Sequence, residues 1–189
     1  MDHSDHVSLI RDGVGGGPTW AELGSGTGAF TLALADLLGP GGTIYSVDRD
    51  ADALRRQALA LRQRFPNVAV HQLAADFTQP LELPAVDGLL MANSLHFVRD
   101  KVAVLPGIIG HLHRGGRFIL VEYDTDRGNP WVPYPLSFET WKSVAAAVGL
   151  ADTRRIATVP SRFLGSIYAA LSVRPGSAYA ATAWRSPGS

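Results

Sequence analysis

Apolar positions in the first two thirds of the chain alternate between the spacing of a buried β-strand and that of an amphipathic α-helix. Five runs have the strand pattern: residues 19–23, 43–47, 68–73, 86–92 and 117–123. Apolar side chains recur at helical intervals between most of these runs, for example at Leu54, Leu61 and Phe65 on one helical face. Strands that alternate with helices are typical of βαβ units. The pattern therefore predicts an α/β fold with a doubly wound, mostly parallel sheet.

The helix before the fifth strand contains a proline. Apolar residues between Val102 and Leu112 keep helical spacing, but Pro106 and Gly107 interrupt it. Because proline is well tolerated at the first position of a helix, we expect a short first turn and then a main helix that Pro106 opens. Glycines 115–116 should end this element before the strand begins.

The alternation changes in the last third of the chain. Ser137 can cap a final helix that Gly149 ends. Two strand-like runs follow at 151–159 and 163–173, and the link between them is too short for a parallel crossover. We therefore expect a C-terminal antiparallel hairpin. Residues 174–189 are rich in Ala, Ser, Gly and Pro without periodicity and are predicted to form a disordered tail.

Composition narrows the class of protein. A chain of 189 residues is long enough for one well-buried core, and we expect a single domain over residues 1–173. Lysine plus arginine equals aspartate plus glutamate at 17 each, so no overall field favours nucleic acid as a partner. The absence of cysteine excludes disulfides, thiolate metal sites and cysteine nucleophiles. His3, Asp5 and His6 are a weak metal-ligand pattern, and no metal is expected.

The first residues and the hydropathy of the chain bear on its location. The N-terminal segment is polar and acidic, unlike a signal peptide, and no apolar run approaches the roughly 20 residues that span a bilayer. We expect a cytoplasmic protein that does not act at a membrane.

A glycine-rich turn follows the first strand, in the run Glu22-Leu-Gly-Ser-Gly-Thr-Gly28. Glycines there let a ligand approach the backbone, and the amides that open the next helix favour an anionic group. Asp48 ends the second strand, where a carboxylate can accept hydrogen bonds from ribose hydroxyls. Together the two features indicate a nucleotide-like cofactor. The spacing Gly24, Gly26, Ala29 also satisfies a dinucleotide fingerprint, so an NAD(P)-binding oxidoreductase remains an alternative.

Three features help to decide which nucleotide-like cofactor is bound. They are the acidic Glu22 two residues before the first glycine, the third glycine at Gly28, and the predicted hairpin. With them the chain resembles the class I S-adenosylmethionine-dependent methyltransferases, in the broad group that includes the ubiquinone-biosynthesis type. The resemblance covers about residues 19–173. It implies a Rossmann-like fold, methyl transfer as the activity and S-adenosylmethionine as the cofactor. A non-catalytic cofactor-binding protein is a further alternative.

The resemblance also implies which residues contact the cofactor. The glycine turn would hold the methionine part, and Asp48 the ribose hydroxyls. Arg49 would flank the adenine, Asp76 would bind its amino group and Phe77 would lie beside the ring. The full implied set is Glu22, Gly24, Ser25, Gly26, Gly28, Asp48, Arg49, Asp76, Phe77, Asn93, Ser94 and Leu95.

The methyl acceptor is less clearly indicated. The fourth strand continues as Asn93-Ser-Leu95 and lacks the Asn/Asp-Pro-Pro-Tyr/Phe motif of many methyltransferases that act on amino groups of nucleic acid or protein. We therefore expect a small-molecule acceptor. If its nucleophile is a hydroxyl, His96 and Asp124 are the candidate bases, although either side chain can instead be structural.

Two segments are candidates for enclosing the site. The loop at 124–135 is long for a compact domain, and its Trp131 and Tyr134 can form a substrate wall or simply pack on the sheet. Residues 1–17 precede the first strand and have a possible lid role, as in the resembled family.

Overall fold

The computed structural model describes residues 1–176 and has the α/β architecture that the hydrophobic pattern predicts. One short 3-10 helix, η1, follows β4. In chain order the elements are α1 (His3–Ile10), β1 (Thr19–Leu23), α2 (Ala29–Leu38), β2 (Thr43–Asp48), α3 (Ala51–Arg64), β3 (Ala69–Ala74), β4 (Val86–Ala92), η1 (Leu95–Phe97), α4 (Lys101–Ile109), β5 (Leu112–Tyr123), α5 (Phe138–Ala147), β6 (Ala151–Ser161) and β7 (Gly165–Val173).

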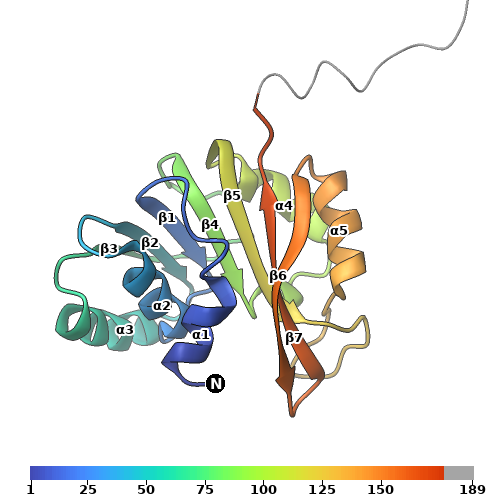
Figure 1. Ribbon diagram of the computed structural model, residues 1–189, viewed down its shortest axis with the longest axis horizontal. Helices are drawn as coiled ribbons and strands as arrows, with labels where there is room; N and C mark the ends of the chain where they lie inside the picture. The colour runs from blue at the N-terminus through green and yellow to red at the C-terminus, as the bar shows by residue number, and fades with distance from the viewer. Residues whose placement is uncertain (177–189) are drawn as a thin grey trace, which may run out of the picture.

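The seven strands form one sheet in the order β3-β2-β1-β4-β5-β7-β6 (Figure 1). The first five are parallel, and β7 lies antiparallel between β5 and β6. The predicted antiparallel hairpin is therefore confirmed, with its second strand inserted next to β5. Because the chain passes from β1 outward to β3 and returns to β4, the crevice between β1 and β4 opens at the carboxyl ends of the strands, where open α/β sheets bind ligands.

Two apolar cores cover the two faces of the sheet. One core packs α1, α2 and α3 against the sheet, and the other packs α4 and α5 against it. Trp20 of β1 is fully buried and lies against Gly88 of β4, where a Cβ atom would be only 2.2 Å from the indole. Close packing of this kind fixes the relation of β1 to β4 and so positions the turns at their ends.

Helix α1 is held by a capping box, in which the side chains of Asp2 and Asp5 each accept a hydrogen bond from the backbone of the other. Its residues Val7, Leu9 and Ile10 are buried, and the helix packs against α2 and β6. Figure 1 shows it in front of the sheet, beside α2.

Two sequence expectations around α4 are wrong. Pro106 lies inside α4 and does not open it, because Asp100 already caps the helix through the N–H of Ala103 at 3.0 Å. Gly115 and Gly116 lie inside β5 and do not precede it. Both glycines bond to the backbone of Arg174, so strand pairing at this point outweighs the local preference of glycine to break an element.

The extra length of β5 is accommodated by an irregular register. Val86 pairs with Leu112, whereas Gly88 pairs with Arg117, so β5 carries additional residues at this point. The guanidinium of Arg174 also donates to the carbonyls of Ile109 and Gly110 at 3.0 and 3.1 Å. Residue 174 is thus ordered, contrary to the predicted start of a disordered tail. Residues 177–189 of that tail lie outside the described part of the chain.

The connection from β3 to β4 has no helix, as the irregular sequence of residues 75–85 suggests. The segment returns from the edge of the sheet to its centre and carries Asp76 and Phe77 past the ends of the strands. Within residues 1–176, no helix is both long and apolar enough to cross a membrane.

Candidate active site

The glycine turn lies between the end of β1 and the start of α2. The N–H groups of Gly24 and Ser25 donate to the carbonyl of Val47 at 2.8 and 3.1 Å, which ties the turn to the end of β2. Gly24, Gly26 and Gly28 have φ angles of 78°, 52° and 91°, a region that L-residues with side chains rarely adopt. The turn therefore needs glycine for its conformation.

The first two glycines have different surroundings. A Cβ atom on Gly24 would lie 2.4 Å from the Cβ of Ser94, so packing against the end of β4 leaves no room for one. A Cβ atom on Gly26 would meet nothing within 4 Å. Gly24 is therefore required by the fold, whereas Gly26 exposes its backbone to open space.

Asp48 links the glycine turn to the start of α3. Its Oδ2 accepts a hydrogen bond from the N–H of Gly26 at 2.7 Å, and its Oδ1 accepts one from the N–H of Asp50 at 2.8 Å. Each carboxylate oxygen has a second lone pair. The carboxylate therefore orders the turn and keeps acceptor capacity for a ligand.

A cavity of about 370 Å³, here called the strand-end cavity, opens at this edge of the sheet. Eight of the residues implied by the sequence line it: Gly24, Gly26, Asp48, Arg49, Asp76, Phe77, Asn93 and Ser94. Four further lining residues were missed: Ala75, Thr78, Phe97 and Val98. Each of these four residues lies within a few positions of a predicted site residue along the chain. Including the neighbours of the predicted residues would therefore have found them.

Four of the implied residues do not line the cavity and lie beneath or beside the turn. Ser25 accepts a hydrogen bond from Ser46, Gly28 packs against the side chain of Gln57, and Leu95 is fully buried in the core. Glu22 is also buried and accepts a hydrogen bond from the hydroxyl of Thr31 at 2.5 Å. Burial raises the pKa of Glu22 to about 8, with the nearby Asp48 carboxylate adding to the shift.

Asn93 has the least satisfied polar side chain of the cavity wall. Its backbone is in the left-handed region with φ 51°, which costs a non-glycine residue free energy. Its Oδ1 atom is shielded from solvent and has no hydrogen-bond partner among the described residues. The strained backbone is a reason to place Asn93 in the site, whereas its Oδ1 atom does not face the cavity in this structure.

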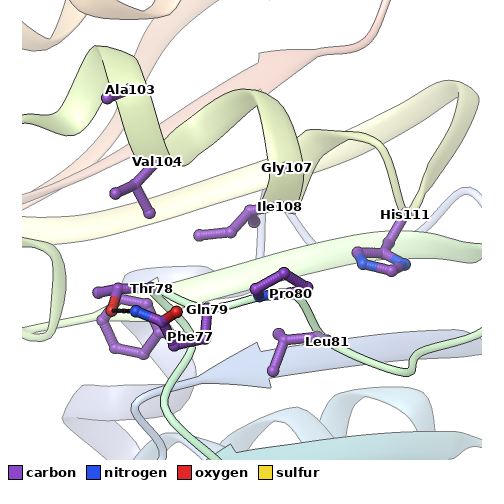
Figure 2. A pocket seen from close by; sticks show the side chains of 10 residues that line it. All are labelled: Phe77, Thr78, Gln79, Pro80, Leu81, Ala103, Val104, Gly107, Ile108 and His111. Atoms are coloured by element: carbon purple, nitrogen blue, oxygen red, sulfur yellow. Dashed lines mark hydrogen bonds between the residues drawn. The ribbon is translucent and has the colours of Figure 1, made fainter.

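A second hollow of about 320 Å³ adjoins the strand-end cavity, with which it shares Phe77 and Thr78. Figure 2 shows Val104 and Ile108 of α4 facing Phe77, Pro80 and Leu81 of the connection between β3 and β4. It is lined mainly by apolar side chains, and Phe77 is the only predicted site residue in its wall. The hollow therefore extends the space beside the strand-end cavity.

His96 and Glu122 form a buried pair next to the strand-end cavity. Glu122 is fully buried and His96 is 3% exposed. Oε2 of Glu122 lies 2.9 Å from Nδ1 of His96, and Oε1 accepts the backbone N–H of His96 at 3.0 Å. Sequence reasoning missed Glu122, because only the pairing of β4 with β5 brings it beside a residue that follows β4.

Asp124, the other candidate base, is engaged by structural partners. Its Oδ2 forms an ion pair with Arg155 at 2.9 Å, and its Oδ1 accepts the N–H of Phe138 at 2.9 Å. These contacts join the end of β5 to β6 and to the first turn of α5. They favour the structural alternative for Asp124.

The loop after β5 lies beside His96. The N–H of Tyr134 donates to the carbonyl of His96 at 3.0 Å, and the Tyr134 side chain is 41% exposed. Trp131 is 73% exposed, whereas Val132 and Leu136 of the same loop are buried. The loop is thus anchored by its aliphatic residues and leaves its two predicted aromatic residues accessible. None of residues 1–17 lines the strand-end cavity, so the lid role of that segment stays a prediction.

Comparison with known proteins identifies the family. The model of a family described as "Methyltransferase domain" matches residues 21–118, just over half of the chain. The match covers the glycine turn, Asp48, the connection that carries Asp76 and the residues that follow β4.

Two curated relatives match over parts of their length. A probable cobalt-precorrin-6B C(15)-methyltransferase (decarboxylating) from Thermoplasma volcanium is 33% identical over 70 residues, which cover 37% of this chain and 35% of the relative. A ribosomal RNA small subunit methyltransferase H from Acidobacterium capsulatum is 35% identical over 114 residues, which cover 51% of this chain and 38% of the relative. The chain thus spans little more than a third of either relative.

Among solved structures, a SAM-dependent methyltransferase from Aquifex aeolicus superposes with a TM-score of 0.67 at 17% identity. The superposition covers 92% of this chain and 99% of that one, so the two share the whole fold. The superposition shows that this chain has the fold of that S-adenosylmethionine-dependent enzyme, and the family match over the turns that build the strand-end cavity shows that the chain belongs to the methyltransferase domain family.

Proposed function

We propose that the protein transfers a methyl group from S-adenosylmethionine to a small-molecule acceptor. The observation that carries the proposal is the strand-end cavity, in which the Asp48 carboxylate and the Gly26 backbone converge beside the aromatic side chain of Phe77. Its volume of about 370 Å³ is in the range of cofactor sites, which is roughly 300–1,000 Å³.

The polar groups of the cavity fit this cofactor. Asp48 has free lone pairs for ribose hydroxyls. S-adenosylmethionine offers hydroxyl, amino and ammonium donors and carries a positive charge at sulfur. Asp76 is mostly exposed, and hydrogen bonds from Thr78 lower the pKa of its carboxyl, so it is ionised and accepts hydrogen bonds at neutral pH.

The cofactor, when bound, supplies an electrophilic methyl group. The protein then has to hold the acceptor in line with the methyl group and exclude water, and correct positioning alone can provide much of the rate acceleration. Phe97 and Val98 line the cavity on the side of η1 and α4, which continues toward His96 and the loop after β5. We assign the acceptor to this side.

Two observations favour a small molecule over nucleic acid. The charges of the chain balance at 17 and 17, and the exposed large side chains of η1 and of the loop after β5 are the aromatic residues Phe97, Trp131 and Tyr134. Polyanion binding needs a surplus of basic side chains. The ribosomal RNA methyltransferase among the relatives is the reason to test RNA directly.

Calorimetry tests the cofactor assignment. The protein should bind S-adenosylmethionine and its demethylated product, S-adenosylhomocysteine, and should not bind NAD. Binding of NAD alone would contradict the proposal and favour an oxidoreductase.

A labelled methyl group tests the acceptor class. We expect label from S-adenosylmethionine to enter the small-molecule fraction of a cell extract and not its RNA or protein. Transfer to purified ribosomal RNA would show that the acceptor assignment is wrong while the methyl-transfer assignment holds.

A further inference from the structure

The contacts between His96 and Glu122 determine which ring nitrogen of His96 carries a proton. A carboxylate only accepts hydrogen bonds, and Oε2 of Glu122 lies 2.9 Å from Nδ1 of His96. Nδ1 therefore carries the proton. In the neutral ring this leaves the lone pair on Nε2.

Nε2 of His96 is free to act on a ligand. It makes no hydrogen bond within the described residues, and it is not among the buried atoms that lack a partner. The side chain is 4% exposed, and Nε2 is the ring nitrogen that pairs with no described residue. A ring with one nitrogen fixed by a buried carboxylate and the other without a protein partner has the arrangement of a general base.

The rings of Phe97 and Tyr123 lie beside this histidine, the backbone of Tyr134 donates to its carbonyl, and Phe163 packs against Tyr123. We call these four residues the aromatic rim. The ring centroid of Phe97 lies 4.3 Å from that of His96, and the ring centroid of Tyr123 lies 6.3 Å from that of His96. Phe163, from the turn between β6 and β7, packs edge-on against Tyr123 at 5.9 Å. The rim therefore joins the end of β5, the loop after it, the hairpin and η1.

The rim is accessible and adjoins the strand-end cavity. Phe97 is 59% exposed and lines that cavity, and Phe163 is 52% exposed. Burial and the charge of Glu122 raise the pKa of the Tyr123 hydroxyl, so it keeps its proton at neutral pH and does not compete as a base. Exposed aromatic faces next to a buried polar pair are suited to a planar ligand with one polar group.

We propose that the acceptor is a planar aromatic compound carrying a hydroxyl group, that Nε2 of His96 removes the hydroxyl proton, and that Glu122 is the positioning residue for His96. This inference rests on the proposed methyltransferase function. It assigns an acceptor class and a proton path on the side of the site that the cofactor does not fill.

The proposed step balances as follows. The acceptor oxygen bonds to the methyl carbon, and the carbon–sulfur bond breaks with its electron pair remaining on sulfur, which becomes neutral. The hydroxyl proton moves to Nε2 of His96. The resulting imidazolium is stabilised by the Glu122 carboxylate, which lies 2.9 Å from Nδ1.

Binding of a matched pair of probes tests the acceptor class. Protein saturated with S-adenosylhomocysteine is titrated with naphthol and with decahydronaphthol, which has the same heavy atoms but is neither planar nor aromatic. Contacts between aromatic rings add about 0.5–1.5 kcal/mol each, so we expect naphthol to bind at least about tenfold more tightly.

The outcomes of this titration separate the two proposals. Equal affinity for the probes, or no binding of either to protein that holds S-adenosylhomocysteine, would overturn the acceptor class and leave the methyltransferase function standing. Failure to bind S-adenosylhomocysteine would overturn both.

Glu122→Gln tests the positioning role. The amide oxygen is expected to keep the bond from the backbone N–H of His96, which places the amide NH₂ toward Nδ1. That group donates to Nδ1 and moves the ring proton to Nε2, where it blocks base catalysis. We expect kcat for naphthol methylation to fall at least about 100-fold, with KM and cofactor affinity changed less than about threefold. Glu82→Gln, the same change at an exposed site, serves as the control.

Nitrogen NMR gives a readout that does not depend on activity. The wild-type protein should show His96 protonated at Nδ1, and Glu122→Gln should show it protonated at Nε2. A wild-type ring protonated at Nε2 would overturn the proposal even if the variant does not fold. Failure of wild-type protein to form methoxynaphthalene from bound naphthol, or an unchanged kcat in folded Glu122→Gln, would also overturn it.

Discussion

The two halves of the candidate site are built in different ways. The cofactor half, at the ends of β1, β2 and β4 and in the segment that follows β3, uses backbone groups and short polar side chains on turns. The acceptor half combines η1, the end of β5, the loop at 124–137 and the tip of the hairpin, and it uses mostly aromatic rings. The first half is a set of local turns, whereas the second exists only where distant segments meet.

The family match follows the same division. It spans residues 21–118 and ends just before Glu122. It therefore covers the turns of the cofactor half and η1 of the acceptor half, but not β7, the hairpin tip or the loop after β5. One half thus identifies the class of chemistry, and the other half is where we propose that the acceptor is selected. Substitutions in the two halves should therefore have separable effects.

The largest effect on the free energy of unfolding is expected at Gly24, and it can be compared with the same substitution at Gly26. Gly24→Ala places a Cβ atom 2.4 Å from Ser94 in a left-handed conformation, so the free energy of unfolding should fall by about 2–5 kcal/mol. Gly26→Ala meets no neighbour within 4 Å and should cost only about 1–2 kcal/mol while weakening cofactor binding. Urea denaturation and calorimetry measure both quantities. Equal destabilisation by the two changes would contradict the distinction.

Asp48→Ala should give the next largest effect, in cofactor affinity. Loss of hydrogen bonds to a charged group costs about 1.5–3 kcal/mol, or roughly ten- to a hundredfold in Kd. Because Asp48 also orders the N–H of Gly26, the glycine turn should loosen as well. Asp52→Ala, at an exposed position in the first turn of α3, is the control. An unchanged Kd in folded Asp48→Ala protein would show that Asp48 does not bind the cofactor.

The buried carboxyl beneath the glycine turn should make the stability of the cofactor half depend on pH. Glu22 has a pKa of about 8 in the folded protein against 4.5 for the ordinary group. Between these values the folded state holds a proton that the unfolded chain releases, so stability falls as the pH rises through this interval.

Glu22→Gln should remove this dependence, since an amide does not titrate. Relative to the variant, wild-type protein should lose up to about 1.4 kcal/mol per pH unit between about pH 5 and 8. Urea denaturation across this range provides the measurement, with Glu82→Gln as the control. Parallel curves for wild type and Glu22→Gln would show that Glu22 is ionised in the fold.

The smallest expected change in cofactor binding comes from the acceptor half. Alanine at both Trp131 and Tyr134 should impair methyl transfer while changing S-adenosylmethionine affinity less than about threefold, or roughly 0.6 kcal/mol. Both side chains are exposed, so the fold should persist. If this double variant loses cofactor affinity as strongly as Asp48→Ala, the two halves are not separable. Full activity on the acceptor would instead make the two aromatic residues dispensable.

Sequence reasoning was most accurate where an interaction is local. The run 22–28, Asp48 and the end of β4 each lie at a strand end that the hydrophobic pattern marks, and most of the implied residues line the cavity. It was wrong about Pro106 and about Gly115 and Gly116, where a helix cap and pairing with Arg174 outweigh the preferences of the residues themselves. The resemblance also implied that Glu22 contacts the cofactor, and the structure places Glu22 beneath the turn, bonded to Thr31.

The sequence by itself determined the α/β class, the glycine turn and the carboxylate that faces it, because strand periodicity and turn chemistry act over a few neighbouring residues. Only the tertiary structure decided that β7 enters the sheet beside β5, that Glu122 lies against His96 and that Phe163 approaches Tyr123. These contacts join residues 26 or more positions apart in the chain. Their formation depends on how strands order and pair, which is set by packing of the whole sheet against both helix layers.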